Sequence, residues 1–129
     1  MSTPLFTIAI PTYNRVQFLR EAIRAALNQS FADFELLIGD NHSTDNSEEA
    51  VRQFKDRRIR YFRHDTNLGP YANFDFLTHQ AQGAFFVLNQ DDDLLHRDFL
   101  QHCREAIALD PAVVMYAATW WRGSQANGF

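Results

Sequence analysis

The chain has 129 residues, 46% of them hydrophobic and 14% aromatic, which is enough for one domain with a packed core. A formal net charge of −4 argues against nucleic acid as a partner, because phosphate neutralisation needs clustered Lys and Arg. No run approaches the ~18 apolar residues of a membrane span, no signal peptide is evident, and Cys103 is the single cysteine. We therefore expect a cytoplasmic protein, at most peripheral at the inner membrane face.

Strand-like and helix-like segments alternate along the chain. The apolar run 5–10 predicts a first strand that Pro11 ends, and Asn14 is the expected cap of the helix that follows. Phe74, Leu77 and Ala81 are expected to face inward from a later helix. The further predicted elements are strand 34–39, helix 47–54, strand 59–62, helix 71–82, strand 84–88, helix 98–109 and strand 112–117.

This alternation predicts an α/β fold with a mostly parallel sheet and helices on both faces. No repeat or internal linker interrupts it, so residues 1–129 are expected to form a single domain. Ligands of open parallel sheets bind beyond the carboxyl ends of the strands. The polar segments 11–14, 40–43 and 89–93 each follow a predicted strand, and we expect them to meet at that edge.

The densest charge in the chain is Asp91-Asp92-Asp93, directly after an apolar strand. Adjacent carboxylates repel one another, and a bound cation relieves that repulsion. Hard oxygen ligands suit Mg²⁺ or Mn²⁺. The alternative is a solvated acidic turn in which an Asp caps the next helix.

The neighbouring polar groups favour a nucleotide diphosphate as the ligand. Tyr13 could stack on a base, Asp40 could accept hydrogen bonds from ribose hydroxyls or a base N–H, and a metal on the Asp triplet could neutralise a diphosphate. The chain has neither G-x-G-x-x-G after the first strand nor G-x-x-x-x-G-K-[ST], so a dinucleotide Rossmann site and a P-loop are not supported.

Four segments in order and in register resemble the family-2 glycosyltransferases with the GT-A fold. They are residues 8–15 (IAIPTYNR), 31–41 with 43–45 (FADFELLIGDN and STD), 67–69 (NLG), and 81–83 (AQG) leading into 91–93 (DDD). The resemblance covers about residues 5–100. It implies sugar transfer, inverting in this family, from a UDP- or GDP-linked donor to a saccharide or lipid-linked acceptor, with Mg²⁺ or Mn²⁺.

The resemblance also assigns roles to single residues. The expected contacts to the donor nucleotide are Pro11, Thr12, Tyr13, Asp40, Asp91 and Asp92, and the expected metal ligands are Asp91 and Asp93. Which pair of the triplet binds the metal stays open at this point. Trp120 and Trp121 could approach the sugar or the acceptor, or simply cover the sheet.

An inverting transfer needs a general base for the acceptor hydroxyl. Asp98, Glu105 and Asp110 lie on or next to a helix that is expected to lead away from the site. We therefore expect the base outside this chain, and residues 1–129 to be the N-terminal, donor-binding part of a longer glycosyltransferase.

A non-catalytic nucleotide-binding or assembly module of the same fold is the alternative. A nucleotidyltransferase is disfavoured, because no basic glycine-rich loop follows the first strand. A sheet edge left uncovered would promote self-association.

Overall fold

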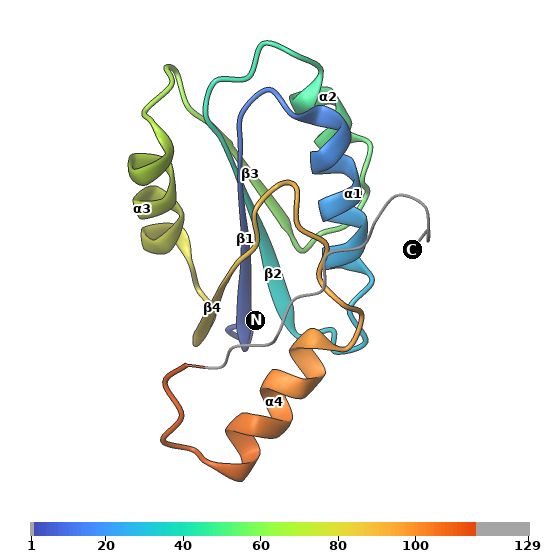
Figure 1. Cartoon of the computed structure of the whole chain (residues 1–129), viewed down its shortest axis with the longest axis vertical. Coiled ribbons are helices and arrows are strands. Elements are labelled where there is room, and N and C mark those ends of the chain that lie inside the picture. The colour runs from blue at the N-terminus through green and yellow to red at the C-terminus, as the bar shows by residue number, and fades with distance from the viewer. Residues whose placement is uncertain (1, 116–129) are drawn as a thin grey trace.

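The computed structural model describes residues 2–115, in which strands and helices alternate (Figure 1). The elements are β1 (Phe6–Thr12), α1 (Val16–Leu27), β2 (Phe34–Asp40), α2 (Ser47–Arg52), β3 (Ile59–Arg63), α3 (Pro70–Gln80), β4 (Phe85–Leu88) and α4 (Phe99–Leu109). No helix in this part of the chain is long and apolar enough to cross a bilayer.

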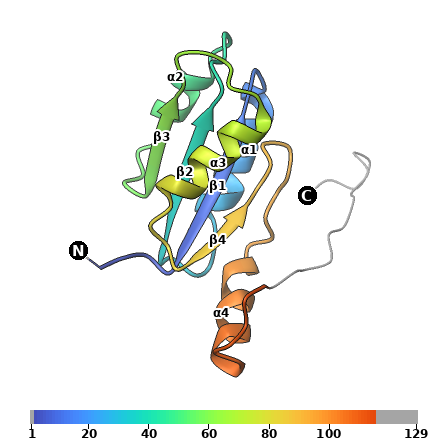
Figure 2. The ribbon, with the colours of Figure 1, turned by 90° about the vertical axis from the view of Figure 1, so that its left-hand side faces the viewer.

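The four strands form one parallel sheet in the order β3-β2-β1-β4. Thr12 at the end of β1 is in register with Asp40 at the end of β2, whereas β4 ends at Leu88, opposite Ala9. Helices α1 and α2 cover one face and α3 covers the other (Figures 1 and 2). The predicted α/β class, with a parallel sheet and helices on both faces, is confirmed.

The core follows the alternation of side chains along the strands. Ile8 and Ile10 of β1 are fully buried in the larger cluster, which also contains residues of α1 and α4. Ala9 faces the other way and packs with Leu37 and Leu77 under α3. Cys103 of α4 belongs to the larger cluster and is 5% exposed, which agrees with a core role.

Pro11 does not end β1, because the strand continues to Thr12. The carbonyl of Ala9 accepts from the Asn89 N–H on the side of β4. The backbone nitrogen of Pro11, two residues further along β1, points to the same side, but the pairing of β1 with β4 has already ended there. The missing N–H of Pro11 therefore leaves no rung of the ladder unpaired. Strand β4 is only partly buried, since within the described residues it borders only β1.

Two further predictions need correction. Phe74 is 38% exposed, while Asn73 takes the inward place on α3, because its amide is bonded to the buried carbonyl of Gly39. Residues 112–115 form no strand, and the rest of the predicted strand 112–117, like Trp120 and Trp121, lies outside the described residues.

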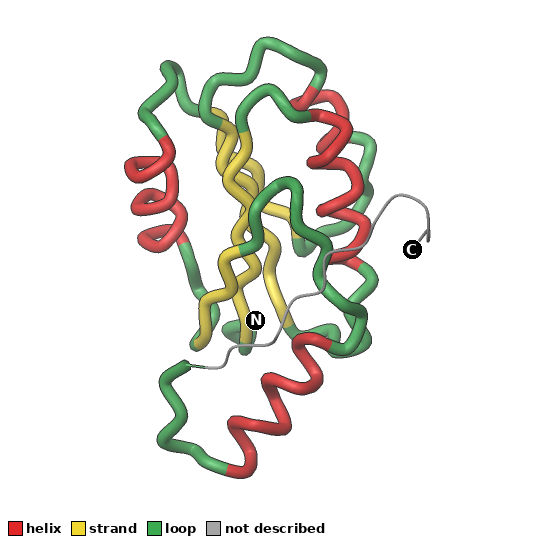
Figure 3. Tube along the Cα trace, in the orientation of Figure 1, coloured by secondary structure: helices red, strands yellow, loops and turns green. Residues whose placement is uncertain are grey.

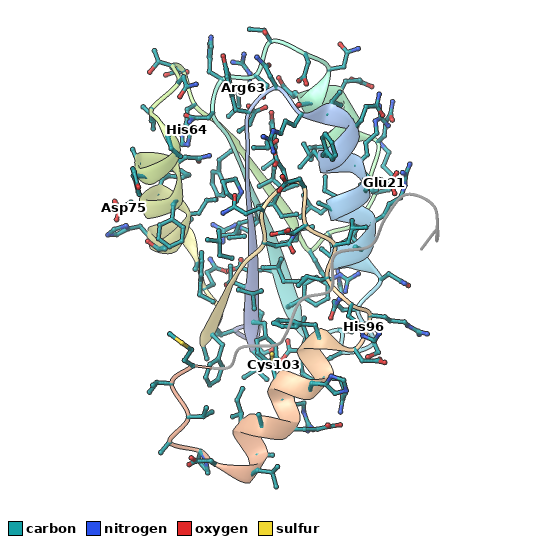
Figure 4. The ribbon with its side chains drawn as sticks, in the orientation of Figure 1. Glu21, Arg63, His64, Asp75, His96 and Cys103 are labelled. Atoms are coloured by element: carbon teal, nitrogen blue, oxygen red, sulfur yellow. The ribbon has the colours of Figure 1, made fainter. Side chains whose placement is uncertain are left out.

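Loops gather at the two ends of the sheet (Figure 3). Arg63 and His64 lie at the carboxyl end of β3, and Cys103 lies on α4 at the opposite end of the sheet (Figure 4). Asp98 precedes α4 and accepts from Ser30, in the loop before β2, so the carboxylates around α4 are held away from the carboxyl ends of the strands.

Candidate functional site

A cavity of about 600 Å³ opens at the carboxyl ends of β1 and β4. Its wall combines the loops after these strands with the first turns of α3. The lining residues are Pro11, Thr12, Tyr13, Arg15, Asn41, Asn67, Pro70, Tyr71, Asn73, Phe74, Leu88, Gln90 and Asp91. Aromatic and amide side chains thus share the wall with one carboxylate and one guanidinium, a composition typical of small-molecule sites.

The charged centre of the wall is built from Thr12, Arg15 and Asp91. Thr12 Oγ1 donates to one Asp91 oxygen at 2.9 Å, and Nη1 of Arg15 donates to the other at 3.3 Å. The same Nη1 reaches Asp92 at 3.1 Å. Asp91 is only 6% exposed, whereas the side chains of Arg15 and Asp92 are about half exposed. A buried carboxylate therefore joins the end of β1 to the loop after β4.

Burial sets the ionisation of Asp91. Desolvation raises the pKa of this carboxyl, and the nearby charge of Asp92 acts in the same direction. The hydrogen bond from Thr12 and the charge of Arg15 oppose that rise without cancelling it. A bound cation would stabilise the charged form of such a group.

Residues 43–45 hold the loop between β1 and α1 in place. The backbone N–H of Asn14 donates to Ser43 Oγ at 2.9 Å, and that of Val16 donates to Asp45 at 3.0 Å. Asn14 has φ 50°, and its side chain accepts from Thr44 N–H at 2.7 Å. The prediction of Asn14 as the helix cap is therefore wrong: Asp45 binds the first N–H of α1, and Asn14 binds the neighbouring loop.

Asp40 is not among the residues that line the cavity. It is fully buried, and it accepts from the Ser43 N–H at 2.7 Å and from the Tyr61 hydroxyl. Burial and the Asp40 charge together raise the pKa of Tyr61, so this phenol stays a donor. In this structure Asp40 fixes the loop after β2, and its contact to a donor nucleotide stays a prediction.

On the α3 side, Asn73 joins the cavity wall to the sheet. Its Nδ2 donates to the Gly39 carbonyl at 2.8 Å, and its Oδ1 lies 2.9 Å from Nε2 of His64. A Cβ on Gly39 would lie 2.4 Å from Oδ1 of Asn73, so a larger residue at Gly39 would displace that amide.

Of the predicted donor-binding residues, the cavity wall contains Pro11, Thr12, Tyr13 and Asp91. Asp92 is exposed and paired with Arg15, and Asp93 is exposed. Within residues 2–115 no three His, Cys, Asp or Glu side chains converge as a metal site. The pairing of Asp91 with Asp93 as metal ligands therefore stays a prediction.

Arg15 and Tyr71 line the cavity although the sequence assigns them no role in the site, and Gln90 was expected there only as a member of the segment 89–93. Arg15 was visible as the residue after Pro-Thr-Tyr-Asn, but its partners lie 76 and 77 positions away. Tyr71 is 88% exposed on the first turn of α3, an unusual place for a large aromatic side chain. That exposure appears only once the helix has been placed.

The family follows from a comparison with known proteins. The family model described as "Glycosyl transferase family 2" matches residues 7–127. The chain belongs to this family. The recognition from sequence is thereby confirmed, and named relatives of the chain are glycosyltransferases.

One relative of this family-2 chain is the GalNAc(5)-diNAcBac-PP-undecaprenol beta-1,3-glucosyltransferase of Campylobacter jejuni. It is 35% identical over 95 residues, which cover 71% of this chain and 31% of the relative. The match spans 41% and 31% of the length of the first two curated relatives, and as little as 14% of others.

Two solved structures share the fold. S. aureus TarS 1-349 in complex with UDP-GlcNAc has a TM-score of 0.77 and 25% identity, covering 81% of this chain and 31% of that one. The mannosyltransferase PcManGT from Pyrobaculum calidifontis, in complex with GDP-Man and Mn²⁺, has the same score and identity and covers 87% and 34%. The GT-A assignment of the fold is thus confirmed.

Proposed function

We propose that residues 1–129 are the donor-binding part of a longer, metal-dependent glycosyltransferase that moves a sugar from a UDP- or GDP-linked donor to an acceptor hydroxyl with inversion. The observation that carries the proposal is the cavity in which Thr12, Arg15 and Asp91 meet at the carboxyl ends of the strands. The nucleotide sugars bound to TarS and PcManGT, which share this fold, support it.

The residues fit Mg²⁺ or Mn²⁺ by the chemistry of their donor atoms. Asp91 and Asp93 would supply carboxylate oxygens, the ligands that these hard cations prefer. Burial already disfavours an isolated negative charge on Asp91, so a cation there would relieve an electrostatic cost. The Mn²⁺ bound to PcManGT supports the same choice. When bound, the metal would stabilise the negative charge that develops on the leaving diphosphate.

The remaining residues of the wall would bind and orient the donor. Tyr13, 46% exposed beside Pro11 and Thr12, offers a ring face for the nucleobase. Asn41 and Asn73 line the same cavity, and their amides bond to neighbouring backbone and side-chain groups that shape its wall. Asp92 would contact the donor from the rim, and Asp40 would act near the base or ribose.

A second candidate is a non-catalytic nucleotide-binding module. Asp91 is the only carboxylate among the described residues that line the cavity, and it is already bonded to Thr12 and Arg15. A general base for the acceptor would therefore have to come from elsewhere. Transfer or hydrolysis of a nucleotide sugar by the 129-residue chain would exclude this second candidate.

Calorimetric titration tests the first proposal. UDP and GDP are titrated into the full chain with and without Mn²⁺, and into the variants Asp91→Asn, Asp93→Asn and Asp33→Asn. We expect Mn²⁺-dependent binding of one nucleotide, weakened about tenfold or more in the first two variants, since hydrogen bonds and ligands to charged groups are lost. Asp33 is exposed just before β2, at the opposite end of the sheet, and serves as the control. Binding of neither nucleotide would refute the proposal.

We also propose that the acceptor is a saccharide or a lipid-linked saccharide met at the inner membrane face. The relative that acts on a PP-undecaprenol substrate supports the lipid-linked choice.

We further propose that the protein self-associates along β4. Leu88, Val114 and Met115 are exposed beside a groove of 320 Å³ that β4 borders. Light scattering across a concentration series should show association, and a monomer at every concentration would contradict it.

A further inference from the structure

The guanidinium of Arg15 contacts the buried carboxylate of Asp91, a ligand of the proposed metal, and the half-exposed carboxylate of Asp92. Its Nη1 lies 3.3 Å from Asp91 Oδ1 and 3.1 Å from Asp92 Oδ2. A Mg²⁺ ion sits about 2.0–2.1 Å from each ligand oxygen. A metal bound to Asp91 would lie close to this guanidinium, and the two positive charges would repel each other, so metal binding and the present contacts of Arg15 oppose each other.

The backbone around Arg15 is fixed, whereas its side chain can move. Asn14 and Val16, on either side, donate their backbone N–H groups to Ser43 and Asp45. The Arg15 side chain is 51% exposed, and in the described part of the chain its hydrogen bonds go only to Asp91 and Asp92. The guanidinium can therefore exchange partners without moving α1.

The unused donors of Arg15 suit a phosphate. A guanidinium has five N–H donors, and both contacts here use the single nitrogen Nη1. Arg15 also lines the cavity with Thr12 and Tyr13, where the proposed function places a nucleoside diphosphate. Planar, forked donors bind phosphate oxygens in pairs, so a diphosphate can compete strongly with the two carboxylates for the Arg15 guanidinium.

We infer that Arg15 couples diphosphate binding to metal binding: it pairs with Asp91 and Asp92 in the free protein and exchanges them for the diphosphate, which frees Asp91 to bind a divalent metal together with Asp93. The inference rests on the proposed function. It makes Arg15 a positioning residue with respect to the metal and a direct contact of the diphosphate. The free chain should then bind metal weakly, and nucleotide and metal should bind with positive coupling.

Mn²⁺ binding tests the coupling without any activity assay. Free Mn²⁺ is counted by electron paramagnetic resonance in titrations of the full chain, with and without UDP or GDP. In the wild type, the nucleotide should tighten Mn²⁺ binding by about 5- to 150-fold, the usual range of coupling between sites. In Arg15→Gln, Mn²⁺ should bind more tightly than in the wild type without nucleotide, nucleotide affinity should fall, and the coupling factor should shrink toward one.

Two further variants control the test. Arg24→Gln removes the same charge from an exposed ion pair with Glu21 on the same helix, and should leave the coupling at the wild-type value. Arg15→Lys keeps the charge but loses the forked donors, so Mn²⁺ binding without nucleotide should stay weak while nucleotide affinity falls.

The outcomes separate the inference from the proposed function. If the wild type binds neither nucleotide with Mn²⁺, the proposed function fails and the inference with it. If the wild type binds both, but Arg15→Gln keeps the wild-type coupling factor, the proposed function stands and the inference is overturned. Circular dichroism of each variant checks that its fold is retained.

Discussion

At the scale of single residues, the carboxylates at the end of the sheet divide by what they touch. Asp91 faces the cavity and is held by Thr12 and Arg15. Asp40 faces the protein, where Ser43 and Tyr61 donate to its two oxygens. The first arrangement leaves a carboxylate that a ligand can reach, and the second fixes a loop.

We predict that Asp40→Asn lowers the free energy of unfolding by about 1–3 kcal/mol, because one of the two donors to this buried carboxylate loses its acceptor. Tyr61→Phe removes the hydroxyl half of the same contact and should cost less. Urea denaturation of both single variants and the double variant measures the pair. Because the two changes remove one shared contact, their costs should not add. Additive costs would contradict the contact between Asp40 and Tyr61.

The sequence predicts the residues of the site that follow strands, and it does so for a physical reason. Thr12, Tyr13 and Asp91 are placed by the ends of β1 and β4, and strand ends can be read from apolar runs. Arg15 could not be assigned a role, because its partners depend on how the loop after β4 folds back toward the loop after β1. Such loop geometry leaves no local pattern in the sequence.

At the scale of elements, one carboxylate serves the first turns of two helices. Asp45 accepts from Val16 N–H at the start of α1 and from Ser47 N–H at the start of α2, both at 3.0 Å. The local signal, Asn14 before a helical pattern, predicted the wrong cap because a distant loop supplies a better-placed oxygen. Element types were predictable from periodicity, whereas this contact between elements 29 residues apart was not.

We predict that Asp45→Ala destabilises the protein by about 1–3 kcal/mol, since each lost cap costs about 0.5–2 kcal/mol. Asp45→Asn keeps one acceptor oxygen and should lose about half as much. Asp65→Ala, which removes an exposed carboxylate from a neighbouring loop, is the control and should be near neutral. Urea midpoints measure all three. Equal midpoints for Asp45→Ala and Asp65→Ala would rule out the double cap.

At the scale of the whole molecule, the two ends of the sheet have different roles. The carboxyl ends of the strands carry the cavity, and the opposite end is joined by a buried carboxylate. Glu35 accepts from Thr7 Oγ1 of β1 at 2.7 Å, from Arg60 of β3 at 2.8 Å and from the Gln82 N–H before β4 at 2.6 Å. One side chain thus connects three strands of the sheet to the segment that leads into the fourth.

This carboxylate makes stability depend on pH. Burial alone would raise the pKa of Glu35, but the hydrogen bonds from Gln82, Thr7 and Arg60, with the charge of Arg60, outweigh it and lower the pKa below 4.5. The unfolded chain therefore takes up a proton on Glu35 before the folded chain does. The stabilisation from Glu35 is complete above pH 4.5 and is lost as the pH falls toward the folded-state pKa.

We predict that Glu35→Gln lowers the urea midpoint of unfolding near neutral pH and flattens its decline in acid. The wild type should lose stability as the pH falls below 4.5 toward the folded-state pKa of Glu35, and the variant should lose less over the same interval, because its amide does not titrate. Glu105→Gln, an exposed change on α4, should follow the wild-type curve. Urea midpoints of Glu35→Gln and the wild type that fall in parallel with decreasing pH would contradict the prediction. The three hydrogen bonds to Glu35 would then not favour its charged form, and the cohesion of the strands at this end of the sheet would have to come from packing.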